Sequence, residues 1–340
     1  MGRRTELRLD SREIFPGARS AVCVALQYSP LEGGQAIEGD LWPRVARYAR
    51  GVDYHDFMKK RLELLADRVE EAYPSCETRS YVDTGPVLER ELAERAGLGA
   101  MGKNTMLLNE TSGSWMLLGE LFLSLDLEPD IAVADLCGSC TQCLEACPTG
   151  ALPAPYRLDA NRCISYWTIE HRGPLPRDVR RQMNGWVFGC DLCQEACPWN
   201  EDVVRTNQPE MLLPAWRAEL DLTGLLRIDR DQYVERFRGS PMKRAKQEGL
   251  QRNAAVAMGN SGESRFVPAL LEALDNESGL VRLHVAWALA EIGGEAAFAG
   301  LQARHAIEAE PEVAQEIEWA LSRFESSGTP SAQSCPEPLG

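Results

Sequence analysis

The stretch between residues 137 and 198 decides the fold of this chain, because eight of its eleven cysteines lie there. It begins Cys137-x-x-Cys140-x-x-Cys143-x-x-x-Cys147-Pro148, continues with a single Cys163, and ends Cys190-x-x-Cys193-x-x-x-Cys197-Pro198. The first run has bacterial ferredoxin spacing, in which three thiolates hold one [4Fe–4S] cluster and the fourth, before proline, reaches another. The second run lacks its first cysteine, and Cys163 can fill that place if the intervening residues loop out.

The spacing therefore predicts two [4Fe–4S] clusters whose ligand sets cross between the runs. One set is Cys137, Cys140, Cys143 and Cys197, and the other is Cys163, Cys190, Cys193 and Cys147. Zinc sites pair C-x-x-C motifs and have no use for the Cys-Pro ending. Disulfides are not expected in a chain without a secretory signal. The scattered Cys23, Cys76 and Cys335 receive no role.

The composition predicts a cytoplasmic protein of two or three domains. The 340 residues are 44% hydrophobic, enough to bury a substantial core, and no apolar run approaches the length that spans a bilayer. The N-terminus Met-Gly-Arg-Arg is followed by no apolar segment of the signal-peptide kind. Thiolates that hold iron also require a reducing compartment.

The net charge of −15 ordinarily argues against a nucleic-acid partner, but the charge is unevenly distributed. Residues 306–340 carry seven acidic side chains and one basic side chain. Two other stretches, 172–181 and 238–252, are locally basic. A basic face of this kind is compatible with a structured RNA ligand, and a solvated helix face explains it equally well.

Residues 1–130 are expected to form a mixed α/β domain of the α+β class. Strand patterns cover 20–28, 79–83, 106–108 and 115–125, and helical patterns cover 56–72 and 87–96. No regular βαβ repeat emerges. The Pro- and Gly-rich segment 131–215 is expected to be a ferredoxin-like module organised by its clusters.

The C-terminal part is expected to be a helical repeat. Trp287-Ala-Leu289 recurs 32 residues later as Trp319-Ala-Leu321, and Ala255-Val-Ala257 lies 32 residues earlier. This period fits short HEAT-like helix pairs, which must stack to bury their apolar faces. We therefore assign 216–325 to HEAT-like repeats that pack on the cluster module, and 326–340 to a disordered tail.

The clusters alone indicate electron transfer to a cofactor. The sequence contains neither a G-x-G-x-x-G after a strand nor a P-loop motif. Flavin and a corrinoid are the remaining candidates for the electron acceptor.

Six further motifs give the chain a close resemblance to the epoxyqueuosine reductases. They are Tyr81-Val-Asp83-Thr-Gly-Pro-Val-Leu-Glu89-Arg90, Ala96-Gly-Leu-Gly99-x-x-Gly102-Lys103-Asn104, Gly113-Ser114-Trp115, Cys163-Ile-Ser-Tyr-Trp-Thr-Ile-Glu170-His171-Arg-Gly173-Pro174, Gly185-Trp186-x-Phe188-Gly189-Cys190-Asp191 and Phe237-x-Gly239-Ser-Pro-x-Lys243-Arg244. The resemblance covers roughly residues 15–320, and the segment before Pro16 is short for the family. It implies an oxidoreductase with cobalamin and two [4Fe–4S] clusters. Such an enzyme reduces epoxyqueuosine to queuosine in a tRNA anticodon loop, the last step of queuosine synthesis.

The resemblance also implies site residues, most of them in residues 1–130, which are expected to form the cobalamin-binding catalytic domain. Asp83 matches the family's proton donor, although an Asp before Thr-Gly also commonly caps a turn. A carboxyl group can serve as this acid if its pKa is raised. Cobalamin contacts are expected at Lys103, Asn104, Ser114, Ser165 and Tyr166. His55 is expected to be a polar contact or a helix N-terminal residue rather than a cobalt ligand.

The expected partners are a tRNA anticodon stem-loop and a flavodoxin- or ferredoxin-like electron donor, with no membrane and a monomeric chain. RNA contacts are assigned first to Lys243, Arg244 and Arg252, and second to Arg177 and Arg181. Two other classes stay open. One is a cobalamin-dependent reductase of a small molecule, similar to the reductive dehalogenases, and the other is a non-catalytic electron-transfer scaffold.

Overall fold

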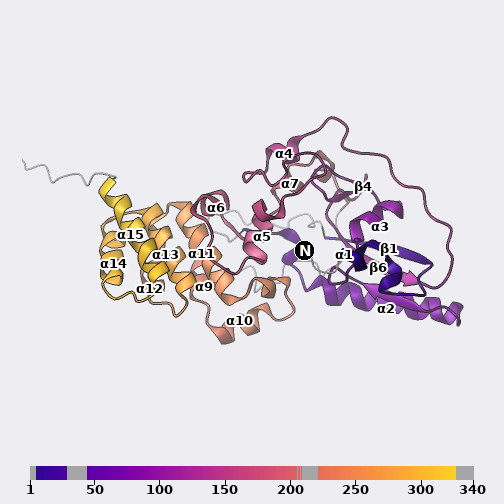
Figure 1. Ribbon diagram of the computed structural model, residues 1–340, viewed down its shortest axis with the longest axis horizontal. Helices are drawn as coiled ribbons and strands as arrows, with labels where there is room; N and C mark the ends of the chain where they lie inside the picture. Colours follow the sequence, from indigo (N-terminus) through magenta and orange to yellow (C-terminus); the bar gives the residue numbers. More distant parts are fainter. Residues whose placement is uncertain (1–4, 29–43, 205, 207, 209–220, 327–340) are drawn as a thin grey trace, which may run out of the picture.

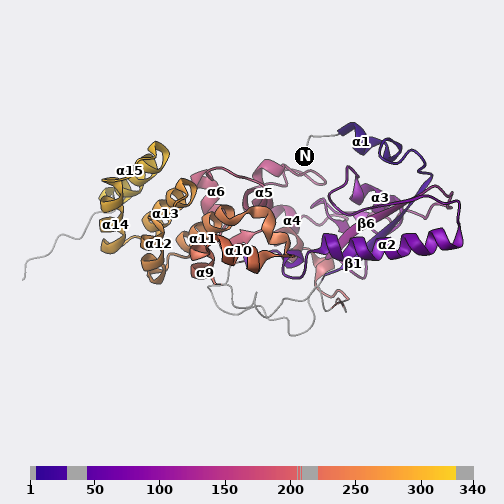
Figure 2. The ribbon, with the colours of Figure 1, turned by 90° about the horizontal axis from the view of Figure 1, so that it is seen from below.

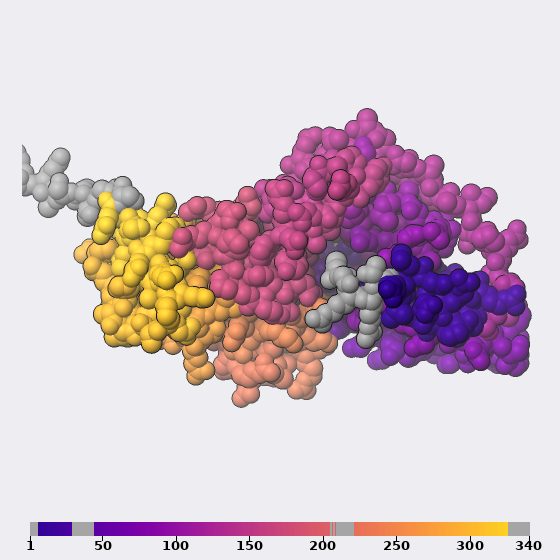
Figure 3. All heavy atoms as spheres, viewed as in Figure 1, coloured from indigo at the N-terminus to yellow at the C-terminus, as the bar shows by residue number. Residues whose placement is uncertain are grey.

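The computed structural model describes residues 5–28, 44–204, 206, 208 and 221–326. The molecule is elongated: a sheet-containing domain forms one end, stacked helices form the other, and the cysteine-rich segment lies between them (Figures 1 and 2). In the space-filling view the three parts form one continuous body (Figure 3). Across these described ranges no helix is both long and apolar enough to cross a membrane.

The N-terminal domain is built on a three-stranded antiparallel sheet. Its strands β1 (Ser20–Gln27), β6 (Met116–Leu123) and β3 (Thr78–Tyr81) lie in the order β1-β6-β3. Helix α2 (Tyr54–Ala72) packs on one face through Met58 and Leu62. A Cβ atom on Gly119 would lie 3.1 Å from both side chains, so the absence of a side chain there lets the helix approach closely.

The opposite face of the sheet lies toward α3 (Glu89–Arg95) and the N-terminal helix α1 (Thr5–Leu9). The sequence located four strands, β1, β3, β5 (Leu107–Leu108) and β6, and the two longer helices of this domain correctly, to within two or three residues, but it missed the two-residue strand β4 (Ala100–Met101). One pairing is less regular than a simple meander: β5 pairs with β4 and not with the following β6.

The cysteine-rich segment contains short helices and little sheet. Its elements are α4 (Gln142–Glu145), α5 (Ile164–Ile169), α6 (Arg177–Gln182), β7 (Trp186–Phe188) and α7 (Leu192–Glu195). Strand β7 pairs in parallel with β2 (Arg44–Val45), a segment that precedes α2 in the chain. This pairing ties the N-terminal domain to the segment between the two cysteine runs.

The C-terminal part is a stack of helices with the expected 32-residue period. Its elements are α9 (Leu222–Arg227), α10 (Arg230–Phe237), α11 (Gln247–Ser261), α12 (Val267–Ala273), α13 (Gly279–Ile292), α14 (Glu295–His305) and α15 (Pro311–Ser326). Helix α13 packs between α11 and α15 (Figure 1). A Cβ atom on Gly259 would lie 2.7 Å from the Trp287 ring, so glycine permits this close helix contact.

The helical stack shares one hydrophobic core with the cysteine-rich segment, as the sequence predicted. Buried Ile164, Trp186 and Phe188 belong to the same cluster as Leu250 and Trp287. The repeats are therefore anchored on the cluster-binding part of the chain. The predicted disordered tail, 326–340, lies almost wholly outside the described residues.

Arg252 provides the central polar contact of this shared core. Its side chain is fully buried and donates to the carbonyl oxygens of Trp167 at 2.8 Å, His171 at 2.9 Å and Gly173 at 3.0 Å. Burial lowers the pKa of its guanidinium to about 9. The expectation that Arg252 contacts RNA is wrong, because this side chain satisfies three buried carbonyl groups that end and follow α5.

We predict that Arg252→Met lowers the thermal stability of the protein sharply. Removing the guanidinium leaves three carbonyl oxygens without donors in the core, which costs on the order of 3 kcal/mol or more. Arg265→Met is the matched control, because Arg265 is half-exposed, where it forms an ion pair with Glu263 and lies over the Phe266 ring without satisfying any buried carbonyl group. Thermal unfolding followed by circular dichroism checks the pair, and equal melting temperatures for the two variants would contradict this role of Arg252.

Candidate active site

The site is centred on Asp53, the N-cap of α2. Its Oδ1 accepts from the backbone N–H of His55 at 3.2 Å, a capping bond worth about 1 kcal/mol. The same oxygen lies 2.7 Å from His55 Nδ1, and Oδ2 accepts from Lys243 Nζ at 2.7 Å. The backbone N–H of Asp53 donates to Gly239 O at 2.7 Å. One buried carboxylate thus joins the N-terminal domain to the segment that enters the repeats.

Asp83 lies at the other side of the His55 ring. Its Oδ2 is 3.1 Å from His55 Nε2, and its backbone N–H donates to a carboxylate oxygen of Glu89. The backbone of Asp83 has φ +51°, a left-handed conformation that is uncommon for a residue other than glycine. The side chain is 59% exposed and bonds across 28 residues of sequence rather than capping its own turn. This placement favours a functional over a turn-capping role.

The imidazole of His55 lies between two carboxylates and has a raised pKa. Burial lowers the pKa of His55, but the hydrogen bonds that its ring donates to Asp53 and Asp83 outweigh it and raise the pKa to about 9. The hydrogen bond from His55 in turn lowers the pKa of Asp83, against a smaller opposing effect of burial. At neutral pH the pair is an imidazolium and a carboxylate. The structure therefore puts the proton on His55, whereas the sequence argument required a raised pKa on the acid itself.

Two further carboxyl groups lie behind Asp83 on the α3 side of the sheet. Burial raises the pKa of Glu89 to about 7 and that of Glu120, on β6, to about 9. Glu120 is fully buried, and neither of its carboxyl oxygens has a hydrogen-bond partner. Arg8 Nε, close to α3, is also buried without a partner. Our sequence reasoning missed Glu120, although a single acid in the apolar strand Leu117–Leu123 was a usable signal.

The eight cysteines come together in two groups. Electrostatic interactions connect Cys197 with Cys137, Cys140 and Cys143. In the second group, Cys163 and Cys190 interact with Cys147, and Cys193 interacts with Cys163, Cys190 and also with Cys143 of the first group. In the described part of the chain, no three Cys, His, Asp or Glu side chains surround a single ion position. A [4Fe–4S] cube is different, because each thiolate binds its own iron atom.

Three residues expected to contact cobalamin instead connect the N-terminal domain to the cysteine runs. Lys103 Nζ donates to Gly138 O at 2.6 Å and Cys140 O at 2.8 Å. Asn104 Nδ2 donates to Cys193 O at 3.2 Å. Ser114 Oγ accepts from Asn200 Nδ2 at 2.9 Å. The three side chains are buried and engaged within the protein, so a contact of these residues with cobalamin through their backbone amides stays a prediction.

Ser165 and Tyr166 lie in the first turn of α5. Their backbone N–H groups hydrogen-bond to the Cys163 thiol, and the Tyr166 ring packs against Trp167. They therefore adjoin the second cysteine group through the main chain. Whether their side chains contact cobalamin stays a prediction.

The other residues that were expected to contact RNA differ in their ion pairs and in the exposed fraction of their side chains. Arg177 and Arg181 each form a two-pronged ion pair with the repeats, to Glu316 and Glu291 respectively. Lys243 and Arg244 have side chains that are 55% and 64% exposed, and Arg244 pairs with Glu170. The pair at 243–244 lies beside the Asp53–His55–Asp83 chain and is the better placed to meet a bound substrate.

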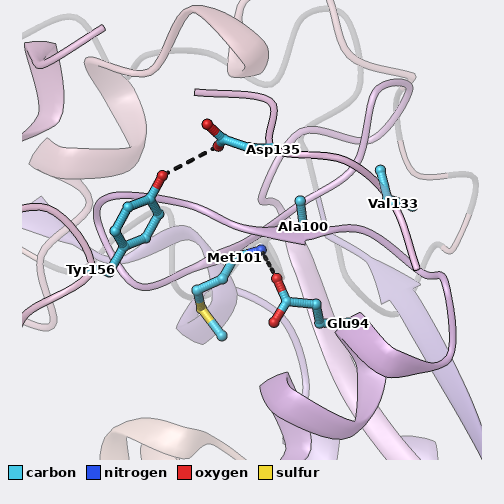
Figure 4. A pocket seen from close by; sticks show the side chains of 6 residues that line it. All are labelled: Glu94, Ala100, Met101, Val133, Asp135 and Tyr156. Atoms are coloured by element: carbon cyan, nitrogen blue, oxygen red, sulfur yellow. Dashed lines mark hydrogen bonds between the residues drawn. The ribbon is translucent and has the colours of Figure 1, made fainter. Parts of the chain in front are cut away.

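A separate pocket of about 360 Å³ lies beside the first cysteine run. Glu94, Asp135 and Tyr156 line it, and their polar groups already have partners: Glu94 accepts from Met101 N–H and Tyr156 donates to Asp135 (Figure 4). Neither His55 nor Asp83 lines this pocket. We assign no chemistry to it.

Comparisons with known families match three segments of the chain. Residues 8–84 match the family described as epoxyqueuosine reductase QueG, residues 136–200 match the 4Fe-4S double cluster binding domain, and residues 242–322 match HEAT repeats. The epoxyqueuosine reductase of Xanthomonas campestris pv. campestris is 41% identical over 300 residues, which cover 86% of this chain and 84% of the relative. The chain belongs to the epoxyqueuosine reductase family.

Other epoxyqueuosine reductases agree in sequence and in fold. The enzyme of Gloeobacter violaceus is 43% identical over 267 residues, 76% of this chain and 81% of the relative. A structure of epoxyqueuosine reductase from Bacillus subtilis, with its catalytic aspartate loop swung out of the active site, superposes with a TM-score of 0.89 at 32% identity. That match covers 94% of this chain and 86% of the other. An epoxyqueuosine reductase crystallised with an epoxyqueuosine-modified tRNA-Tyr stem loop superposes with a TM-score of 0.86 at 33% identity and the same coverage.

The protein is thus a reductase, an oxidoreductase with a mixed helix-and-sheet domain, an iron–sulfur domain and HEAT-like repeats. Enzymes of the epoxyqueuosine reductase family use cobalamin and two [4Fe–4S] clusters.

Proposed function

We propose that this chain reduces the epoxide of epoxyqueuosine to the alkene of queuosine in the anticodon loop of a tRNA, the last step of queuosine synthesis. Family membership over most of the chain supports this reaction, and the related enzyme bound to a modified stem loop supports the substrate. The observation that carries the proposal is the exposed carboxylate of Asp83, hydrogen-bonded to a cationic His55.

The proposed division of labour follows the three parts of the chain. Residues 1–130 bind cobalamin and carry the acid, 131–215 hold the clusters, and 216–325 hold the tRNA. A single chain in the cytoplasm, reduced by a flavodoxin- or ferredoxin-like protein, is the arrangement that we propose.

The N-terminal domain contains polar groups that suit cobalamin. The corrin ring carries primary amide side chains, which donate and accept hydrogen bonds. The unpartnered carboxyl of Glu120 and the buried Nε of Arg8 lie on one side of the sheet, and each lacks such a partner. We propose that these two residues hold the amides of the cofactor. When bound, reduced cobalamin supplies the electrons, and the clusters restore its reduced state one electron at a time.

Asp83 is the residue that we assign to proton delivery. Converting an epoxide into an alkene and water consumes two electrons and two protons, and the departing oxygen is a poor leaving group unless it is protonated. The carboxyl of Asp83 is accessible, and its backbone is fixed by the bond from its N–H to Glu89. Tyr54 also hydrogen-bonds to this carboxylate and helps to orient it.

The test of the function is an anaerobic single-turnover assay on an epoxyqueuosine-containing tRNA stem-loop. We predict that the wild-type protein, reconstituted with cobalamin and clusters, forms queuosine and that Asp83→Asn retains both cofactor spectra but is slower by about 10²–10⁴-fold. Product from a halogenated small molecule but none from the stem-loop would support the small-molecule reductase instead. Full activity of Asp83→Asn would remove the acid role.

The two cysteine groups are proposed as the two cluster sites, with Cys137, Cys140, Cys143 and Cys197 in one and Cys163, Cys190, Cys193 and Cys147 in the other. We predict that Cys163→Ser halves the iron content, to about four per chain, because one cube loses a thiolate. Cys76→Ser, a buried cysteine outside both groups, is the control and should retain about eight. Iron analysis with electron paramagnetic resonance measures both, and full iron in Cys163→Ser would contradict the ligand set.

Lys243 and Arg244 are proposed to contact the phosphates of the anticodon loop. We predict that Arg244→Glu weakens stem-loop binding and lowers the slope of log K against log salt, because each lost phosphate contact removes a released counterion. Arg227→Glu is the control, since Arg227 has an exposed ion pair with Glu272 on the same repeats. Fluorescence anisotropy over a salt series measures the effect, and identical slopes for the two variants would place the RNA elsewhere.

A further inference from the structure

The reaction that we propose consumes two protons, which is more than one carboxyl group carries at a time. Both protons that are consumed go to the same oxygen, which leaves as water. Asp83 carries at most one proton at a time, so it must be reprotonated before the second transfer. A second donor within hydrogen-bond distance of the Asp83 carboxylate reloads it without waiting for a proton from solvent.

His55 has the required position. Its Nε2 is 3.1 Å from Asp83 Oδ2, and its Nδ1 is 2.7 Å from Asp53 Oδ1. The Tyr54 ring stacks on the imidazole with centroids 4.1 Å apart, which fixes the ring plane. Asp53 cannot take over as a proton acceptor readily, because Lys243 and His55 together hold its pKa well below the usual range despite its burial.

We propose that His55 stores a proton and transfers it to Asp83 between the two protonations of the departing oxygen. His55 acts through Asp83 and is therefore a positioning residue. This inference deepens the proposed function and rests on it. In the reloading step the N–H bond at His55 Nε2 breaks and an O–H bond forms at Asp83 Oδ2. The imidazole is left neutral, with its Nδ1–H still donated to Asp53 Oδ1. This carboxylate therefore selects the tautomer whose Nε2 lone pair faces Asp83.

The imidazole can be recharged from solution. Its side chain is 30% exposed, so water reaches the ring after it has given up its proton. A fully buried histidine such as His284, whose pKa is lowered well below the ordinary value mainly by burial, could not store a proton in this way. The exposure of His55 and its two carboxylate partners together make it a rechargeable donor.

Several other charged or titratable groups interact electrostatically with His55 and Asp83, and all of them are compatible with proton storage on His55. From α2 the groups are Asp53 and Tyr54, from α3 Glu89 and Arg90, from β6 Glu120, and from the segment before α11 Lys243 and Arg244. Glu89 and Glu120 have raised pKa values because they are buried, so they add less negative charge than two ionised acids would. The proton thus stays between His55 and Asp83.

The ionisation of His55 tests the storage site without any turnover. We predict that ¹³C-labelled His55, in cluster-loaded protein, titrates near pH 9 in an NMR experiment and that Asp83→Asn moves this pKa toward the ordinary 6.5. His171, whose pKa is lowered by burial and which does not contact this pair, is the internal control and should titrate alike in the two proteins. Titration of wild-type His55 near 6.5, or a value that Asp83→Asn leaves unchanged, would overturn the proposal.

The variant His55→Gln tests the reloading step by its rate. Its amide N–H can still donate a hydrogen bond to Asp83, but it has no proton to transfer. The single-turnover rate of this variant should fall about tenfold per pH unit between pH 6 and 9, because solvent must then protonate Asp83 directly. The wild-type rate should stay nearly flat across this range. Parallel profiles for the two proteins would refute the relay alone, whereas no product from the wild type would refute the proposed function.

Discussion

The carboxylate of Asp53 makes the interaction on which the active site depends. It caps α2, orients the His55 ring and binds the ammonium of Lys243, while its own N–H group donates to Gly239. These contacts come from segments almost 190 residues apart in the sequence. The side chain is 5% exposed, so an unpaired charge at this position would be costly. The start of the helix, the imidazolium and the entry to the repeats are thereby fixed to one another.

Contacts of the repeats with α5 and with Asp53 hold the helical stack close to Asp83. Their first helix, α11, is anchored through Arg252 to the carbonyl groups around α5, whose first turn hydrogen-bonds to Cys163. The segment just before α11 supplies Lys243 to Asp53. One end of the helical stack therefore touches both the proposed second cluster site and the pair His55–Asp83 that we propose to deliver protons. A substrate held by the repeats would reach the acid and the electron source together.

The sequence predicted the parts of this molecule better than their contacts. The cysteine spacing, the 32-residue helical period and the strand patterns are local or periodic signals. The structure confirmed the helical period and the strands as elements, and the match to the 4Fe-4S double cluster binding domain confirmed what the cysteine spacing indicated. The functions of individual polar residues were harder to predict. Lys103 and Arg252 were assigned to ligands because they are charged and lie in family motifs, yet both satisfy buried carbonyl oxygens of the chain itself. Such contacts join distant segments and leave no pattern in the sequence.

For Asp83, too, the sequence predicted the residue but not the neighbours that set its pKa. The family motif pointed to Asp83, but the pKa of a carboxyl group depends on what the fold places beside it. Here that neighbour is His55, which lowers the pKa of Asp83 and holds the proton instead. Its position opposite Asp83 depends on the left-handed backbone at residue 83 and on the cap of α2. Neither feature could be read from the residue types alone.

The most direct measurement of this account is the pH dependence of the single-turnover rate of the wild-type holoenzyme on an epoxyqueuosine-containing stem-loop. If the proton is stored on His55 and delivered through Asp83, the rate is maintained through neutral pH and falls only as the pH passes about 9. A rate that already declines between pH 4 and 5, as expected for an ordinary aspartic acid acting alone, would contradict the account.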